Sequence, residues 1–172
     1  MKKGGCHQIM YGAESGDQQI LNNIRKHITL EQIRQAVKET KKAGIECRLA
    51  FMIGNPGETV ETVKKTIKFA IELDPDIVIF NITAPNPGTE IYEWAKKNNY
   101  LSSQKWEEFD LSYPVLNLPT ISNEDIKKYY KLAYRSFYYR PRYFLKRLMK
   151  IRNFNDVSSM FNGLKGIINV TK

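Results

Sequence analysis

Apolar and polar positions follow two alternating patterns along the first hundred residues, one typical of strands and one typical of helices. Short apolar runs, typical of buried strands, occupy residues 6–12, 45–53 and 77–82. Segments in which apolar residues recur every three or four positions, as on one face of a helix, occupy residues 17–24, 29–43, 58–73 and 90–97. Strands that alternate with helices in this way predict an α/β fold built on a parallel sheet.

Polar residues and glycines mark where some of these elements begin and end. Thr29 is followed three residues later by Gln32, which is the spacing of a capping box at the start of a helix. Gly44 stands where the same helix is expected to end, because glycine accepts the left-handed conformation found there. Residues 49–53 are nearly all apolar, which predicts a strand covered on both faces.

The alternation of predicted strands and helices ends after Asn98, and the rest of the chain follows a different pattern. Residues 99–121 read as an irregular connector, with Trp106, Phe109, Tyr113 and Leu116 expected to pack on the sheet layer. Residues 122–172 read as a helical extension that is basic and aromatic, in which Pro141 separates two helices. We therefore expect three parts, with boundaries at 1–98, 99–121 and 122–172.

The composition is that of a single domain, or of a piece of a larger one. The 172 residues are 42% hydrophobic, which is enough for one core. No apolar run approaches the roughly 20 residues of a membrane-spanning helix. Two cysteines, Cys6 and Cys47, make neither a disulfide framework nor a metal site. The expected setting is therefore reducing and cytoplasmic.

The net charge of +9 is concentrated in one segment. Residues 127–152 contain ten Lys and Arg and no acidic residue, whereas the remainder has 17 basic and 18 acidic residues. Such a segment can bind RNA through phosphates and base stacking, or lie on an anionic membrane. We favour a third interpretation, in which tyrosines at helical spacing pack on the sheet and long basic side chains face water.

The three expected strands end in turns that are rich in glycine, proline and small polar residues, at 12–16, 54–59 and 85–89. The carboxyl ends of parallel strands lie at one edge of a sheet, which is where α/β proteins bind ligands. Glu14 and Ser15 offer an acceptor and a hydroxyl at this edge. These groups suit a ribose and an adenine better than a phosphate, and the sequence has no phosphate-binding glycine loop.

Four motifs, taken in order, resemble the second half of a radical S-adenosylmethionine (radical SAM) domain. They are GAESG at 12–16, KAGI at 42–45, GNPGET at 54–59 and PNPGTEIY at 85–92. The resemblance covers residues 4–98 and implies a partial (β/α) barrel, with about three parallel βα units of a TIM-like radical SAM barrel followed by C-terminal α-helices. It implies that this edge of the sheet borders the adenosine of SAM. The residues that it implies in cofactor binding are Glu14, Ser15, Arg48, Gly54, Asn55, Pro56, Gly57, Glu58, Pro85, Asn86 and Pro87.

In the resembled family, a Cys-x3-Cys-x2-Cys loop holds the [4Fe-4S] cluster that is used to cleave SAM reductively. This chain has no such triplet, so we assign it no metal-binding residue and expect it to be inactive alone. The missing N-terminal half of the barrel would come from the same gene or from a separate chain. Residues 135–143 resemble the C-terminal extension of the radical SAM subgroup that carries a cobalamin-binding domain. This resemblance implies that a domain missing from this chain would bind cobalamin.

Several alternatives stay open on the sequence alone. The substrate could be a small or lipid-like molecule, with nucleic acid less expected. The chain could instead be a non-catalytic remnant whose basic C-terminal helices bind RNA or an anionic surface. Among single residues, Glu14 could cap the helix near Asp17 and Glu58 could face the dipole of the helix that follows it. Asn86 could close a turn, and Cys47 could fill the core.

Overall fold

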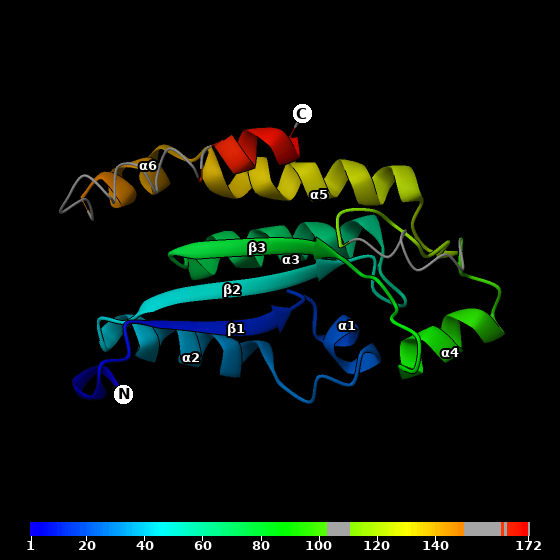
Figure 1. The fold of residues 1–172 in the computed structure, drawn as a ribbon, viewed down its shortest axis with the longest axis horizontal. Coiled ribbons are helices and arrows are strands. Elements are labelled where there is room, and N and C mark those ends of the chain that lie inside the picture. Colours follow the sequence, from blue (N-terminus) through cyan, green and yellow to red (C-terminus); the bar gives the residue numbers. More distant parts are fainter. Residues whose placement is uncertain (103–110, 150–162, 164, 172) are drawn as a thin grey trace.

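The computed structural model describes residues 1–102, 111–149, 163 and 165–171. Three parallel strands form one sheet in the order β1-β2-β3, with bounds Gln8–Glu14, Glu46–Ile53 and Ile77–Ile82. Figure 1 shows the strands side by side, with helices packed along them. The expected α/β class, with three parallel βα units followed by helices, is confirmed. Trp106, Phe109 and the segment 150–162 lie outside the described residues.

The helices follow the strands in the expected places. Their bounds are η1 Lys2–Gly4, α1 Gln18–Asn23, α2 Leu30–Lys42, α3 Val60–Leu73, α4 Glu90–Lys97, α5 Asn123–Tyr138 and α6 Pro141–Leu148. Thr29 and Gln32 form the predicted capping box at the start of α2. Gly44 follows that helix with a left-handed φ of 68°, as expected of a residue that ends it. α3 begins at Val60 rather than at 58, because the Thr59 side chain caps it.

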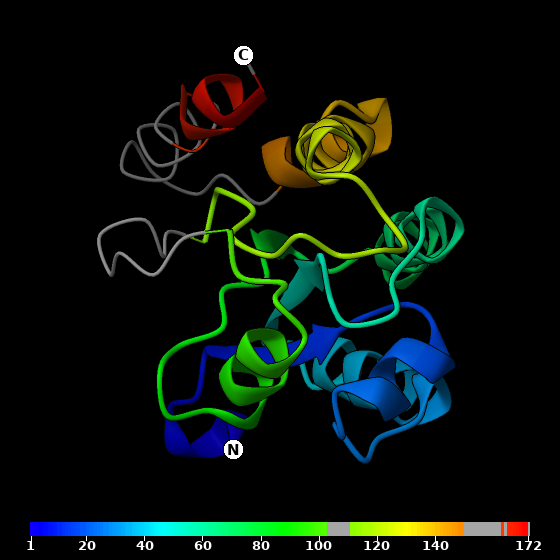
Figure 2. The same cartoon turned by 90° about the vertical axis from the view of Figure 1, so that its right-hand side faces the viewer.

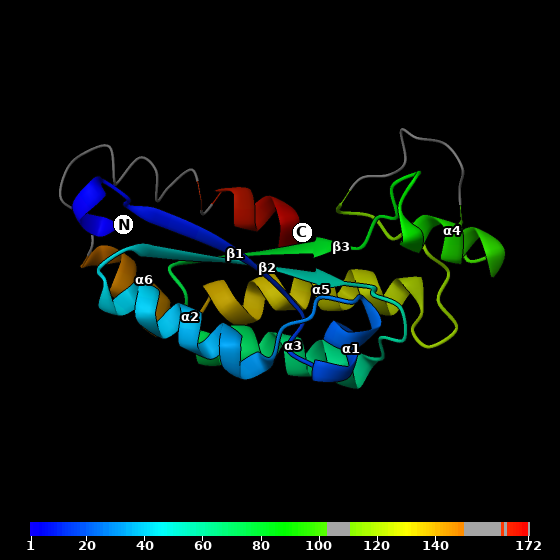
Figure 3. The ribbon, with the colours of Figure 1, turned by 90° about the horizontal axis from the view of Figure 1, so that it is seen from below.

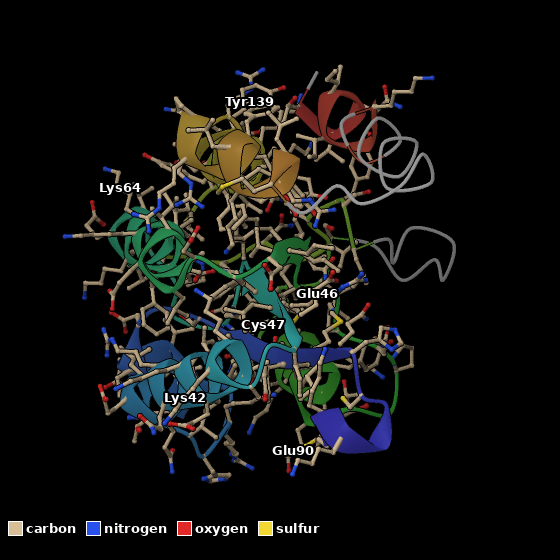
Figure 4. The ribbon with its side chains drawn as sticks, turned by 90° about the vertical axis from the view of Figure 1, so that its left-hand side faces the viewer. Lys42, Glu46, Cys47, Lys64, Glu90 and Tyr139 are labelled. Carbon is tan, nitrogen blue, oxygen red and sulfur yellow. The ribbon has the colours of Figure 1, made fainter. Side chains whose placement is uncertain are left out.

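The two faces of the sheet differ in burial, so the predicted cover on both faces of β2 is complete on one face and partial on the other. In β2, Cys47, Leu49, Phe51 and Ile53 are 0% exposed, whereas the alternating residues Glu46, Arg48, Ala50 and Met52 are only half-buried. Helices α2, α3 and α5 lie along the buried side (Figure 3), and the chain after α4 runs on the other side (Figure 2). Figure 4 shows Cys47 toward the helices and Glu46 away from them.

Tyrosines of α5 cover the outer edge of β3. The Tyr138 hydroxyl donates to the Val78 carbonyl at 2.6 Å and accepts from the Val78 amide at 3.1 Å. The Tyr134 hydroxyl makes the same pair of bonds with the carbonyl and amide of Phe80, at 3.0 and 3.3 Å. The prediction that the tyrosines pack on the sheet is therefore confirmed. Tyr113, by contrast, is 61% exposed, while Leu116 is buried as expected.

Among the residues that the structure describes, no helix is long and apolar enough to cross a membrane.

Candidate functional site

The carboxyl ends of the three strands lie at one edge of the sheet, at the right of Figure 1. At the end of β1, Glu14 has a left-handed φ of 61° and its carboxylate accepts from Lys26 Nζ at 3.0 Å. A Cβ on Gly12 would come within 2.3 Å of Glu14 Oε1, so this arrangement requires glycine at position 12. The alternative in which Glu14 caps α1 was wrong, because Asp17 accepts the first amides of that helix.

Ser15 links the end of β1 to α3 by a hydrogen bond. It is 0% exposed, and its hydroxyl lies 3.2 Å from the hydroxyl of Thr66 and accepts from the Asp17 amide at 3.1 Å. The Gly16 amide also donates to the Thr66 hydroxyl, at 2.9 Å. The Ser15 hydroxyl therefore faces α3, and its hydrogen bonds stay within the protein.

Glu58 fixes the turn that follows β2. It is 0% exposed, and its Oε2 accepts from the amides of Gly54 and Asn55. Its Oε1 is buried without a hydrogen-bond partner among the described residues. Burial raises the pKa of this carboxyl to about 7. The interpretation of Glu58 as a carboxylate in the first turn of α3 was wrong, because it precedes the capping residue and binds back to its own turn.

Asn55 joins the end of β2 to the end of β3. Its Oδ1 accepts from the Thr83 hydroxyl at 3.0 Å, and its Nδ2 donates to the Met52 carbonyl at 3.1 Å. From the other side, Asn23 Nδ2 donates to the Pro56 carbonyl at 3.0 Å. Gly54, Asn55, Pro56 and Gly57 therefore form a turn that is held at several points before any ligand arrives.

The end of β3 is more open. Pro85 is buried, whereas Asn86 and Pro87 are exposed. The Asn86 carbonyl accepts from the Thr89 hydroxyl at 2.6 Å and from the Thr89 amide at 3.1 Å, so Asn86 does close a turn through its backbone. The Asn86 side chain makes no hydrogen bond in the described part of the chain and is available to a ligand.

Arg48 lies apart from the strand ends. Its side chain is on the half-buried face of β2, where its Nε donates to Glu46 at 2.7 Å. Gly54 is six positions further along the chain, which corresponds to about 20 Å at the usual rise of a strand. The structure thus brings together the turns of Glu14, Gly54 and Pro85, but not Arg48.

The described residues contain no group of three His, Cys, Asp or Glu that could hold a metal ion. Cys47 is buried on the helix side of β2, and burial raises the pKa of its thiol to about 11, which disfavours the thiolate that binds metals. This placement confirms the interpretation of Cys47 as a core residue.

Comparison with known proteins identifies the family. Residues 1–70 match the Radical SAM superfamily. Over 154 residues, the chain is 42% identical to an uncharacterized methyltransferase of Pyrococcus horikoshii. The aligned region covers 90% of this chain and 34% of that protein. The chain belongs to the radical SAM superfamily.

Two further comparisons are more distant. The anaerobic magnesium-protoporphyrin IX monomethyl ester cyclase of Rubrivivax gelatinosus is 23% identical over 137 residues, covering 80% of this chain and 24% of that protein. Coproporphyrinogen III oxidase of Escherichia coli, a radical SAM enzyme, aligns in structure with a TM-score of 0.45 and 17% identity, over 59% of this chain and 27% of that chain. This radical SAM chain spans about a third or less of the length of each of these proteins.

Proposed function

We propose that this chain forms the adenosine side of the SAM pocket in a radical SAM enzyme of the methyltransferase type. The observation that carries the proposal is the strand-end turn 54–58, which is fixed by a fully buried carboxylate within the region that matches the family. A pocket fixed in advance binds its ligand with less loss of conformational entropy. The methyltransferase type comes from the relative that is 42% identical.

The chemistry of the strand ends fits SAM. Neither the turn 53–59 nor the turn 82–89 contains a lysine or arginine, which suits a neutral nucleoside better than a phosphate. Glu14 and Lys26 place a carboxylate and an ammonium 3.0 Å apart. This pair complements the ammonium and the carboxylate of the methionine part of SAM. Asn86 adds an amide without a partner among the described residues.

The iron-sulfur cluster does not fit the described residues, since these contain no suitable group of ligands. We therefore infer that a further segment, in the same protein or in a separate chain, supplies the cluster cysteines and the remaining strands. The outer edge of β1 supports this inference, because in the described part of the chain β1 pairs with β2 alone. Beside that edge lies a cavity of about 350 Å³, lined by residues such as Tyr11, Ile33 and Val37. Cobalamin would likewise be bound outside this chain.

A fusion protein tests the proposal. The part of the Pyrococcus horikoshii methyltransferase that precedes its matched region would be joined to this chain, reconstituted with iron and sulfide without oxygen, and reduced. We expect the fusion to release 5′-deoxyadenosine from SAM, measured by chromatography, and the chain alone to release none. Asn55→Ala in the fusion should weaken SAM binding by about tenfold, because it removes the hydrogen bond that joins the turn to Thr83 at the end of β3.

Two results would contradict the proposal. One is stoichiometric cluster iron on the chain alone. The other is an Asn55→Ala fusion that binds SAM as tightly as the parent fusion, with Lys97→Gln, an exposed residue of α4, as the matched control.

A further inference from the structure

The outer face of α6 carries an apolar patch that the proposed SAM site does not explain. Leu145, Leu148 and Met149 are spaced as i, i+3 and i+4, so their side chains lie on one face of the helix. They are 61%, 52% and 80% exposed. Tyr143 lies on the opposite face, where it is buried and its hydroxyl donates to the Asp76 carbonyl at 3.3 Å.

The basic residues of this region divide into two groups. Arg140 and Lys146 point inward and pair with Asp74 at 3.1 and 3.3 Å. Arg142 is exposed and makes no hydrogen bond or salt bridge with the residues that the structure describes. Arg147 is half-buried and follows Tyr143 by four residues, so it lies on the face of α6 opposite Leu145, Leu148 and Met149. Arg142 precedes Leu145 by three residues and therefore lies beside the apolar patch. We call Arg142, Leu145, Leu148 and Met149 the α6 patch.

We propose that the α6 patch docks on the surface of an anionic lipid bilayer. A short helix with leucines on one face and an unpaired arginine beside them binds the interface through both apolar burial and attraction to anionic headgroups. Charge complementarity favours an anionic partner, because the whole positive excess of the chain lies in residues 127–152. The patch lies on a membrane rather than crossing it, since α6 has only eight residues.

The placement of the tyrosines favours lipid over RNA. Proteins that bind single-stranded nucleic acid stack bases on exposed aromatic rings. Here Tyr129, Tyr138 and Tyr143 are at most 8% exposed, and the Tyr134 hydroxyl is bonded to β3. Tyr139 is 47% exposed, but its hydroxyl lies 3.2 Å from that of Thr171. The exposed apolar residues of the patch are aliphatic, which suits acyl chains and cannot provide stacking.

Vesicle flotation of the full chain tests this proposal. We expect binding to phosphatidylcholine vesicles that contain about a third phosphatidylglycerol, and little binding to phosphatidylcholine alone. Leu145→Ser/Leu148→Ser/Met149→Ser should weaken binding by at least about tenfold through lost apolar burial. Arg142→Gln should weaken it by roughly fivefold. Lys38→Gln, which lowers the charge equally at an exposed position of α2, should change it little.

Other outcomes would overturn the proposal. If the triple serine variant floats as well as the parent chain, charge alone is responsible and the patch has no role. If the control on α2 weakens binding as much as the arginine variant, attraction is not local to α6. If the chain binds a single-stranded oligouridine but no vesicle, the partner is nucleic acid. A lack of binding to all vesicles also rejects the proposal, and none of these results depends on SAM chemistry.

Discussion

The carboxyl of Glu58 makes the turn after β2 sensitive to pH. Burial raises its pKa to about 7 from an ordinary value of 4.5. Between these values the folded chain keeps a proton that the unfolded chain has released. Glu58 therefore favours the folded state at low pH, and this contribution is lost as the pH rises through about 7.

We predict that the free energy of unfolding falls between about pH 5 and pH 8 by about 2 kcal/mol relative to Glu58→Gln, which cannot titrate. Urea denaturation at the two pH values measures this difference. Glu61→Gln, on an exposed position of the first turn of α3, is the matched control and should keep the full pH dependence. If the free energy of unfolding changes equally with pH in the parent chain and in Glu58→Gln, the Glu58 carboxyl titrates as it would in water and the prediction is wrong.

The turns at the strand ends could be predicted from the sequence more readily than the hydrogen-bond partners of their residues. Glycine and proline marked all three turns, because their backbone preferences are local. The partners of Glu14 and Ser15 are Lys26 and Thr66, and nothing local to either pair predicts the contact. Glu58 was misread for a similar reason, since a carboxylate near a helix start can bind either that helix or the preceding turn.

At the scale of elements, α5 replaces a neighbouring strand along β3. Each of two tyrosine hydroxyls bonds both the amide and the carbonyl of one residue of the strand, so four edge groups are satisfied. Unpaired strand edges invite association with other chains. The β3 edge is closed in this way at Val78 and Phe80, whereas β1 pairs with β2 alone among the strands that the structure describes.

Removing one hydroxyl tests this role of α5. Tyr138→Phe keeps the ring but leaves the buried amide and carbonyl of Val78 without the bonds that the structure shows, so we expect a loss of about 2 kcal/mol of stability. Chemical denaturation measures it. Tyr139→Phe, at the half-exposed neighbouring tyrosine, should cost less than about 0.5 kcal/mol. Similar losses for the two variants would mean that the bonds to β3 contribute little.

The elements themselves followed from the sequence, because hydrophobic period and helix caps are local signals. The capping box at Thr29 and the turn at Gly44 were found at the predicted residues. The closed edge of β3 could not be derived in this way. Helical spacing placed the tyrosines on one face of a helix, but only the fold shows that their hydroxyls reach the backbone of Val78 and Phe80.

At the scale of the whole molecule, the C-terminal helices belong to the same core as the sheet. Ile126, Ala133 and Phe137 of α5 are at most 1% exposed and pack with Phe51 and Phe80 of the strands in one cluster. The basic charge of the extension lies outside this shared core. The composition of residues 122–172 therefore suggested a separate part of the chain. The apolar residues of α5 nevertheless share the core formed by the first hundred residues.

A deletion at the predicted boundary tests this dependence. A chain of residues 1–121 loses the apolar residues of α5, and burial of each large one contributes about 2 kcal/mol against a total stability of about 5–15 kcal/mol. It also uncovers the edge of β3. We expect this shortened chain to lack a cooperative thermal transition by circular dichroism and to aggregate. Deleting residues 165–172 removes the contacts of Thr171 with Arg135 and Tyr139, and should leave the transition in place. A cooperative transition in residues 1–121 would instead show that the helical extension is an independent domain.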